Sequence, residues 1–144
     1  MKLLLNILLI SLFLVSNILA TGNPKAKKEI KENTVVSLMN GLNSENLGLR
    51  NSCAYMLGEL ELKTAIIPLM KILREEENED LRITAALALY KIGTPLSINA
   101  VKQSIRFDNS ERVSKHCASF YNNYLKNKSI AEETNEDVDK LVRN

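Results

Sequence analysis

The stretch NEDLRITAALALYKIGTPLSINAVKQSIRF, from Asn78 to Phe107, determines the fold of this chain. Its apolar residues recur at three- and four-residue spacing in two runs, which predicts two amphipathic helices. Gly93 ends the first run, as expected for a left-handed helix stop, and Thr94 with Pro95 supplies a cap and a first-position proline for the second. The stretch therefore predicts a complete helix–turn–helix unit.

The same pattern recurs at a period of 32 residues. Matching columns run through three units: Leu49, Leu81 and Val113; Arg50, Arg82 and Ser114; Ala54, Ala86 and Ala118; Leu57, Leu89 and Tyr121; Leu60, Ile92 and Tyr124. A fixed period of this size is typical of repeat architectures, whose units bury their apolar faces only against their neighbours. The columns therefore predict stacked helical hairpins.

Residues 1–20 have the order of a secretory signal peptide. Lys2 supplies positive charge, an apolar run spans Leu3–Val15, and the small residue Ala20 marks the expected cleavage site. The run is shorter than the ~20 residues that a membrane span needs. An uncleaved anchor stays open as an alternative, because Ile18 is bulkier than the residue preferred there. We expect export, to the periplasm or out of the cell.

The remaining chain divides into three parts. We expect a flexible lead at 21–26, a repeat domain at 27–126, and a polar connector with a short C-terminal capping helix or tail at 127–144. The third unit has Glu133 and Asp137 where the earlier units have aliphatic core residues. The pattern therefore predicts an extended connector there, and whether the last helix docks stays open.

Helix ends and inward faces follow from the same columns. In the first unit, the helix at about 45–61 is expected to face inward with Leu49, Cys53, Met56, Leu57 and Leu60. Thr64 is expected to cap the helix after it. Asp108, with Glu111 as capping-box partner, is expected to cap the first helix of the third unit.

Cys53 and Cys117 lie in one column, two units apart. Helix layers stack at roughly 8–10 Å, which places the two Cα atoms on the order of 20 Å apart. A disulfide needs them within about 7 Å, so we expect no bridge between them even in an exported chain. Each is predicted to be a small buried hydrophobe, with Ala85 in the same place between them.

Composition argues against several function classes. Lys and Arg number 19 and Asp and Glu 17, so a global attraction to nucleic acid is not expected. Two distant cysteines and one histidine predict no zinc site, and no Gly-rich phosphate loop is present. The acidic run Glu75–Asp80 is expected to be a solvated turn, with a calcium site as the alternative. No cofactor is expected.

Catalysis has little support in the sequence. His116 beside Cys117 suggests a Cys–His nucleophile. Adjacent helical residues point about 100° apart, and only Cys117 belongs to the buried column. We therefore expect no catalytic residues.

The motif L-R-x-x-x-A-x-x-L-x-x-I-G appears as LRITAALALYKIG at Leu81–Gly93 and, with its glycine moved to position 58, as LRNSCAYMLGEL at Leu49–Leu60. It resembles HEAT-like repeats and is closest to the short bacterial type also found in phycobilin lyases. The resemblance covers about residues 35–124. It implies an all-α fold, a short right-handed α-solenoid of HEAT-like hairpins with capping helices at both ends.

The resemblance also implies a role for the arginine at the second position of the motif. In the family, this residue commonly pairs with acidic groups near the turn. Arg50 and Arg82 are therefore expected to be structural, with Glu79 and Asp80 available as partners.

In the solenoids that this chain resembles, the second helices usually line the recognition surface. Here they carry a modest basic patch, comprising Lys63, Lys71, Arg74, Asn99, Lys102, Gln103 and Arg106. We expect an exported, non-catalytic protein-interaction module whose protein or peptide partner is acidic. The alternatives are a small accessory or assembly subunit of a larger complex and, more distantly, a pigment-attachment lyase-like enzyme. Neither nucleic acid nor a membrane, beyond the N-terminal segment, is expected as a partner.

Overall fold

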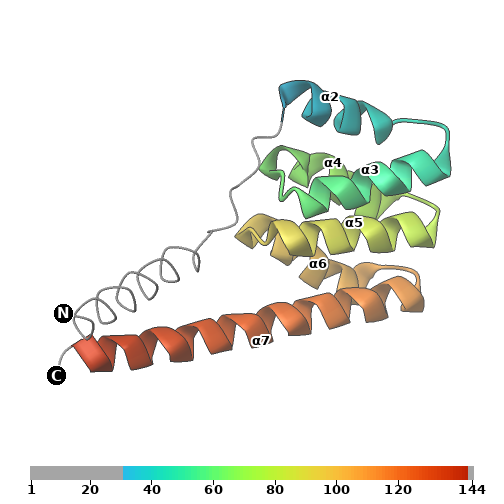
Figure 1. Ribbon diagram of the computed structural model, residues 1–144. Coiled ribbons are helices and arrows are strands. Elements are labelled where there is room, and N and C mark those ends of the chain that lie inside the picture. Colours follow the sequence, from blue (N-terminus) through green and yellow to red (C-terminus); the bar gives the residue numbers. More distant parts are fainter. Residues whose placement is uncertain (1–30, 143–144) are drawn as a thin grey trace, which may run out of the picture. The chain divides into compact units, whose positions relative to one another are not determined.

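A computed structural model describes the backbone of residues 31–142 and the side chains of residues 31–135 (Figure 1). The expected signal peptide at 1–20, the lead at 21–26 and the first residues of the repeat domain lie outside this part, as do the side chains at the end of the last helix. Among the helices that the structure describes, none combines the length and hydropathy that a membrane crossing requires.

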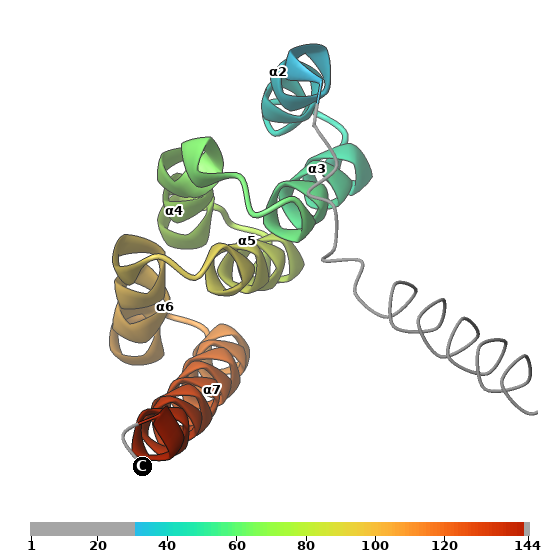
Figure 2. The same cartoon turned by 60° about the vertical axis from the view of Figure 1, so that its left-hand side comes forward.

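The described chain is an all-helical α-solenoid. Helices α3, α5 and α7 lie side by side in one layer, and α4 and α6 form a second layer on one side of it (Figures 1 and 2). The elements in chain order are α2 (Glu32–Gly41), α3 (Leu47–Glu59), the 3₁₀ turn η1 (Lys63–Ala65), α4 (Ile66–Glu75), α5 (Glu79–Ile92), α6 (Pro95–Phe107) and α7 (Glu111–Val142).

One turn design leads into each helix of the first layer. Before α5, Asn78 donates its N–H to Glu76 Oε1 at 3.1 Å and accepts the Leu81 N–H through Oδ1 at 3.0 Å. The equivalent trios are Ser44, Asn46 and Leu49 before α3, and Asp108, Ser110 and Val113 before α7. Each turn satisfies N–H groups that a helix start leaves unpaired.

This design corrects one predicted cap. The hydroxyl of Ser110 accepts the Val113 N–H, so Ser110 caps α7, and the prediction of Asp108 is wrong. The Asp108 carboxylate instead accepts the Ser110 N–H at 2.9 Å and binds Arg82. Its oxygens therefore accept hydrogen bonds from groups that lie outside α7.

The turns within hairpins differ between the two units. Gly93 is left-handed at φ 67° and Thr94 caps α6, with Pro95 in the first position, as predicted. In the first unit the left-handed residue is Glu61, at φ 51°. Thr64 lies inside η1 and makes no capping hydrogen bond, so the prediction that it caps the second helix is wrong. The 3₁₀ turn replaces the side-chain cap there.

Small residues set the spacing between α3 and α5. Gly58 takes no Cβ because Ala88 lies against it: an ideal Cβ would stand 2.5 Å from Ala88 Cα. Ala54, Ala85 and Ala88 are fully buried in the core. The glycine that the repeat motif places at the helix end has therefore a packing role in the first unit.

The inward face predicted for α3 is only partly buried. Cys53 and Leu57 are buried, but Leu49 is 48% exposed and Met56 41% exposed. The equivalent residues of α5, Leu81 and Ala88, are fully buried. Leu49 and Met56 differ because the one described helix before α3 is the short α2, which covers α3 only in part: Gly41 of α2 lies against Cys53 and Leu49.

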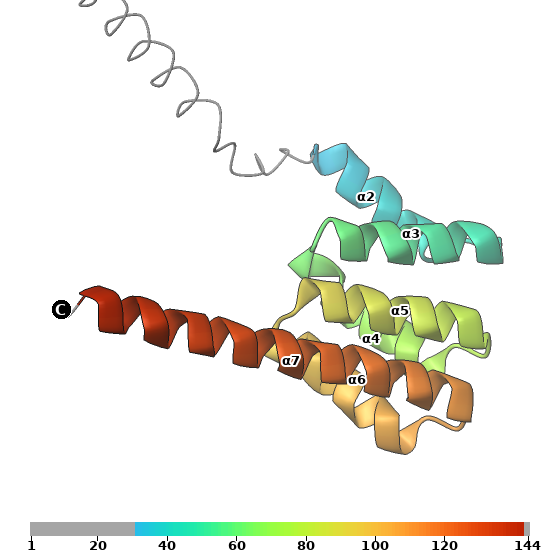
Figure 3. The same cartoon turned by 60° about the horizontal axis from the view of Figure 1, so that its bottom comes forward.

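Helix α7 is unbroken where a connector was predicted. It runs from Glu111 to Val142 without Gly or Pro, whereas Gly93 ends α5 and Pro95 begins α6 in the middle unit. Within residues 31–142 there is therefore no third hairpin, and the expectation of an extended segment near residues 127–133 is wrong. From Leu125 to Asn135 every side chain is exposed, and α7 extends beyond α5 and α6 (Figure 3). Whether Val138 and Leu141 dock lies outside the described side chains.

Cys53 and Cys117 are both buried free thiols, in agreement with their predicted place in the core. Ala85 is fully buried between them in the repeat, also as predicted. The column that contains the three residues therefore lies in the packing between helices of the first layer.

Candidate functional site

The seven residues predicted to bind a partner are all exposed and all belong to the second layer or to the turn before it. Only Arg74 and Gln103 meet in one groove. Lys71 lines a neighbouring hollow of about 420 Å³ with Arg50 and Glu76. The remaining residues, Lys63, Asn99, Lys102 and Arg106, line neither.

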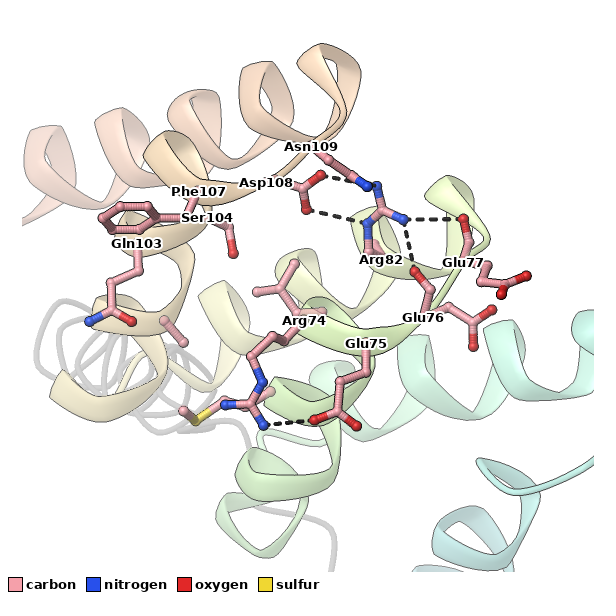
Figure 4. A pocket seen from close by; sticks show the side chains of 13 residues that line it. Arg74, Glu75, Glu76, Glu77, Arg82, Gln103, Ser104, Phe107, Asp108 and Asn109 are labelled. Atoms are coloured by element: carbon pink, nitrogen blue, oxygen red, sulfur yellow. Dashed lines mark hydrogen bonds and ion pairs between the residues drawn. The ribbon is translucent and has the colours of Figure 1, made fainter.

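The groove lies between the C-terminal halves of α4 and α6 and has a volume of about 690 Å³ (Figure 4). Its apolar surface comes from Met70 and Leu73 of α4 and Ala100 of α6. Polar side chains come from both turns that lead into the first layer, at Glu75–Glu77 and at Asp108 and Asn109. A groove of mixed character suits a peptide or a protein side chain better than a wholly apolar ligand.

Arg82 forms the polar end of this groove. Its Nη2 lies 3.0 Å from Asp108 Oδ1, and the two side chains are 7% and 5% exposed. The same guanidinium donates to the backbone oxygens of Glu76 and Glu77 and to Asn109 (Figure 4). Because a buried cation is costly unless its donors are satisfied, this pair fixes one turn against the next.

A second, looser copy of this pair joins the preceding turns. Arg50 Nη1 lies 2.7 Å from Glu76 Oε2, with the side chains 26% and 14% exposed. Both pairs join residues 26 apart in sequence. The arginines are structural, but the expected partners are wrong: Glu79 and Asp80 pair instead with Arg112 of α7. The sequence offered six adjacent acidic or amide residues, and only the turn geometry selects among them.

The acidic run Glu75–Asp80 is therefore only partly a solvated turn, since Glu76 is half-buried and paired. Among residues 31–135, no group of three or more His, Cys, Asp or Glu is arranged to hold a metal ion.

Charge on the second-layer face is mostly positive once internal pairs are set aside. Arg74 contacts Glu75 at 2.8 Å, but both are exposed, so this pair contributes little. Lys102 Nζ lies 5.6 Å from the centroid of the Tyr121 ring. Glu76 and Asp108 are neutralised by Arg50 and Arg82. The exposed acids left on the groove are Glu75 and Glu77.

Phe107 was missed by the sequence reading. It ends α6, lines the groove and is 79% exposed. Its equivalent one unit earlier is Glu75, so the position belongs to no apolar column. The available signal was an aromatic residue at a surface position of the repeat.

The structure also bears on the adjacent His116 and Cys117. Cys117 is fully buried while His116 is exposed. Burial, with the negative charge of Asp108, raises the pKa of the Cys117 thiol to about 12. A protonated, inaccessible thiol is a poor nucleophile.

Comparison with known proteins agrees with this arrangement of paired helices. No curated protein is similar enough to the chain to count as a match. A family profile described as HEAT repeats matches residues 35–119, which is more than half of the sequence. HEAT repeats are commonly protein-interaction modules and generally non-catalytic scaffolds. The chain belongs to the HEAT repeat family.

Proposed function

We propose that this protein is an exported, non-catalytic interaction module whose second-layer face, α4 and α6, binds an acidic protein or peptide. The observation that carries the proposal is the groove between these helices. It combines an apolar floor at Met70 and Leu73, an exposed aromatic edge at Phe107 and a cation at Arg74. Exposed aromatic and Arg side chains together are typical of residues that dominate binding energy at interfaces.

The acidic character of the partner is inferred from the charges that remain available. Lys71, Lys102 and Arg106 extend the cationic side of the face beyond the groove, and Arg74 adds to them. An acidic segment lying along α4 and α6 would meet these groups while an apolar side chain entered the groove. Such complementarity acts chiefly on specificity and on the rate of association.

Charge reversal tests this proposal. Affinity capture from the exported fraction with the unaltered chain identifies the partner, and titration then compares it with an Arg74→Glu, Arg106→Glu variant. Binding is expected to weaken at least about tenfold while the melting temperature stays unchanged, because both residues are exposed. Lys115→Glu, an exposed reversal on α7, is the matched control. Equal binding by the double variant would remove this face as the site.

Export rests on the order of charge, apolar run and small residue in residues 1–20. Mass determination of the chain recovered from the exported fraction tests it. A chain that begins at Thr21 is expected. A chain retained inside the cell would contradict the proposal, and an exported chain that keeps residues 1–20 would favour the anchor.

A small accessory subunit of a larger complex is the second candidate, favoured by the missing third hairpin. Within residues 31–142 no second-layer helix follows α7 to complete its hairpin, and the α7 side chains from Leu125 to Asn135 are exposed. Purification separates the two functions. A monomer that unfolds cooperatively on its own favours the module, and a chain stable only with other subunits favours the alternative.

A further inference from the structure

A hollow of about 310 Å³ lies at the edge of the first layer, where α3 and α5 end and α7 continues past them (Figure 1). Its lining includes Gly58 and Glu59 at the end of α3, the turn residue Glu61, Tyr90 and Lys91 of α5, and Tyr124 of α7. Gly58 contributes no side chain to this space, whereas the equivalent residue one unit on is Tyr90 itself. A hollow of this size suits a single side chain rather than a larger ligand.

Two tyrosine rings from adjacent helices of the first layer line this hollow, and each is fixed by stacking. Tyr90 stacks on Phe120 with ring centroids 5.8 Å apart, and Tyr124 stacks on Tyr121 at 6.5 Å. Both tyrosines remain half-exposed. Rings held in this way lose little conformational entropy when a ligand binds, and the face of a tyrosine ring attracts cations. The rings therefore favour a positively charged group in the hollow.

The charges around the hollow also favour a cation. Lys91 is already held by Glu59 at 2.7 Å, whereas Glu61 is exposed and forms no ion pair within residues 31–135. The last residues of α3 and α5 add the negative ends of two helix dipoles. An entering cation would therefore find one unpaired carboxylate beside the C-terminal ends of two helices.

The backbone of Glu61 points to a role for its side chain. Glu61 is the one non-glycine residue of the described chain with a positive φ, at 51°. The equivalent residue one unit on is Gly93, which adopts the same conformation at φ 67° without the strain of a side chain. A glutamate at this position costs stability and gains no ion pair in return, which is typical of residues kept for binding.

We propose that this hollow binds an arginine side chain of a protein partner. A guanidinium group can lie flat on a tyrosine ring and at the same time donate two hydrogen bonds to a carboxylate. Tyr90 or Tyr124 would supply the ring and Glu61 the carboxylate, while the rest of the partner stays outside the hollow. The site belongs to the first layer, so it is separate from the face of α4 and α6 and does not rest on the function proposed for that face.

Amide NMR of the full chain, titrated with N-acetyl-arginine methylamide up to about 100 mM at constant ionic strength, tests the site. Saturating shifts are expected at Gly58, Glu61, Tyr90 and Tyr124, with a dissociation constant in the millimolar range, because one side chain offers few contacts. The citrulline analogue has the same shape without the charge and should bind at least about fivefold more weakly. The lysine analogue should also bind more weakly, because an ammonium group cannot form the two-bond contact with a carboxylate.

Variants identify the groups that bind the probe. Glu61→Gln and Tyr124→Leu should each weaken binding of the arginine probe at least about fivefold, whereas Tyr124→Phe, which keeps a ring, should stay within about twofold. Glu111→Gln, at an exposed glutamate of α7, is the matched control and should bind like the unaltered chain. Glu61→Gly separates binding from folding, because it should lose binding as Glu61→Gln does while the melting temperature rises.

The proposal is overturned by the absence of saturable shifts, by shifts outside the hollow, by equal or tighter binding of the citrulline or lysine analogue, or by a Glu61→Gln variant that binds like the unaltered chain. A blocked alanine pentapeptide with a central arginine tests the source of the group. It should bind at least as tightly as the single residue, because its ends lie outside the hollow. Tighter binding of free arginine, whose own amino and carboxyl groups are charged, would overturn the assignment to a protein partner. None of these outcomes alters the charge-reversal test at Arg74 and Arg106, so the two proposals fail separately.

Discussion

The close contact between α3 and α5 predicts that Gly58→Ala destabilises the fold, although alanine favours helices. The new Cβ would lie 2.5 Å from Ala88 Cα and 2.7 Å from Ala88 Cβ, where ordinary contacts begin near 3.4 Å. Because the nearer atom is backbone, no rotamer change relieves the overlap. The helices must separate by about 1 Å, which forfeits a quarter to a half of the dispersion attraction across the gap.

The magnitude follows from two opposing terms. Overpacking of this kind costs about 1–3 kcal/mol, with the upper end expected for a backbone contact. Replacing Gly by Ala inside a helix returns about 1 kcal/mol. The free energy of unfolding should therefore fall by about 2 kcal/mol. Ala88→Gly added to Gly58→Ala should not restore it, because the contact with the Ala88 Cα remains.

Urea unfolding monitored by circular dichroism measures this change. Gly48→Ala is the control on the same helix: its nearest neighbour is the Asn46 side-chain oxygen at 3.3 Å, and the residue is exposed. The control should be neutral or up to about 1 kcal/mol more stable. A Gly58→Ala variant as stable as the unaltered chain would refute the argument that glycine sets the spacing of these helices.

Three further predictions concern single groups. Asp108→Asn should lower the free energy of unfolding by about 3 kcal/mol, because it leaves the buried Arg82 without its carboxylate. Urea titration should show a smaller loss for Glu76→Gln, because the Arg50–Glu76 pair is more exposed. Glu61→Gly should increase the free energy of unfolding by about 0.5–1 kcal/mol and so raise the melting temperature, because Glu61 is left-handed at φ 51°. An unchanged or lower melting temperature would contradict this. Since burial raises the pKa of the Cys117 thiol from 9.0 to about 12, the native state holds this proton longer than the unfolded chain, so the stability linked to it is complete below about pH 9 and falls as the pH rises toward 12. Accordingly, a thiol reagent at pH 8 should label Cys117 only in urea, and rapid labelling of the native chain would disprove its burial.

Local signals and the repeat period explain most of what the sequence could predict. Gly93, Thr94 and Pro95 define a helix end and a helix start through their own backbone preferences, without help from tertiary structure. The column with Cys53 and Cys117 was correctly assigned to the core because packing repeats with the sequence. These features depend on neighbours in the chain or on the period alone.

Two errors, the inward face of α3 and the connector near residues 127–133, have a different origin, because each depends on where the repeat starts or stops. Leu49 and Met56 match buried columns, yet within residues 31–142 the single helix α2, and no complete hairpin, precedes them. The polar residues near Glu133 fail the core pattern of a second helix, but without Gly or Pro the chain continues α7 instead of forming a connector. Position within the stack, rather than the residue itself, decides these cases.

The candidate site was predictable as a face but not as a groove. All seven expected residues lie on the second layer or its entry turn, because helical spacing directs them to one side. Phe107 and the pairing of Arg82 with Asp108 escaped prediction, since they depend on how one turn sits against the next. Long-range turn geometry is not encoded in local periodicity.

The two arginine bridges make the solenoid unevenly stiff along its length. Arg50 ties α3 to the turn before α5, and Arg82 ties α5 to the turn before α7, so bending at either joint would stretch a charged clamp. The turn before α3 has Ser44 at the clamp position, where a hydroxyl accepts one backbone N–H. Elastic compliance should therefore concentrate at that first joint, and α2 should swing more readily than any other described helix.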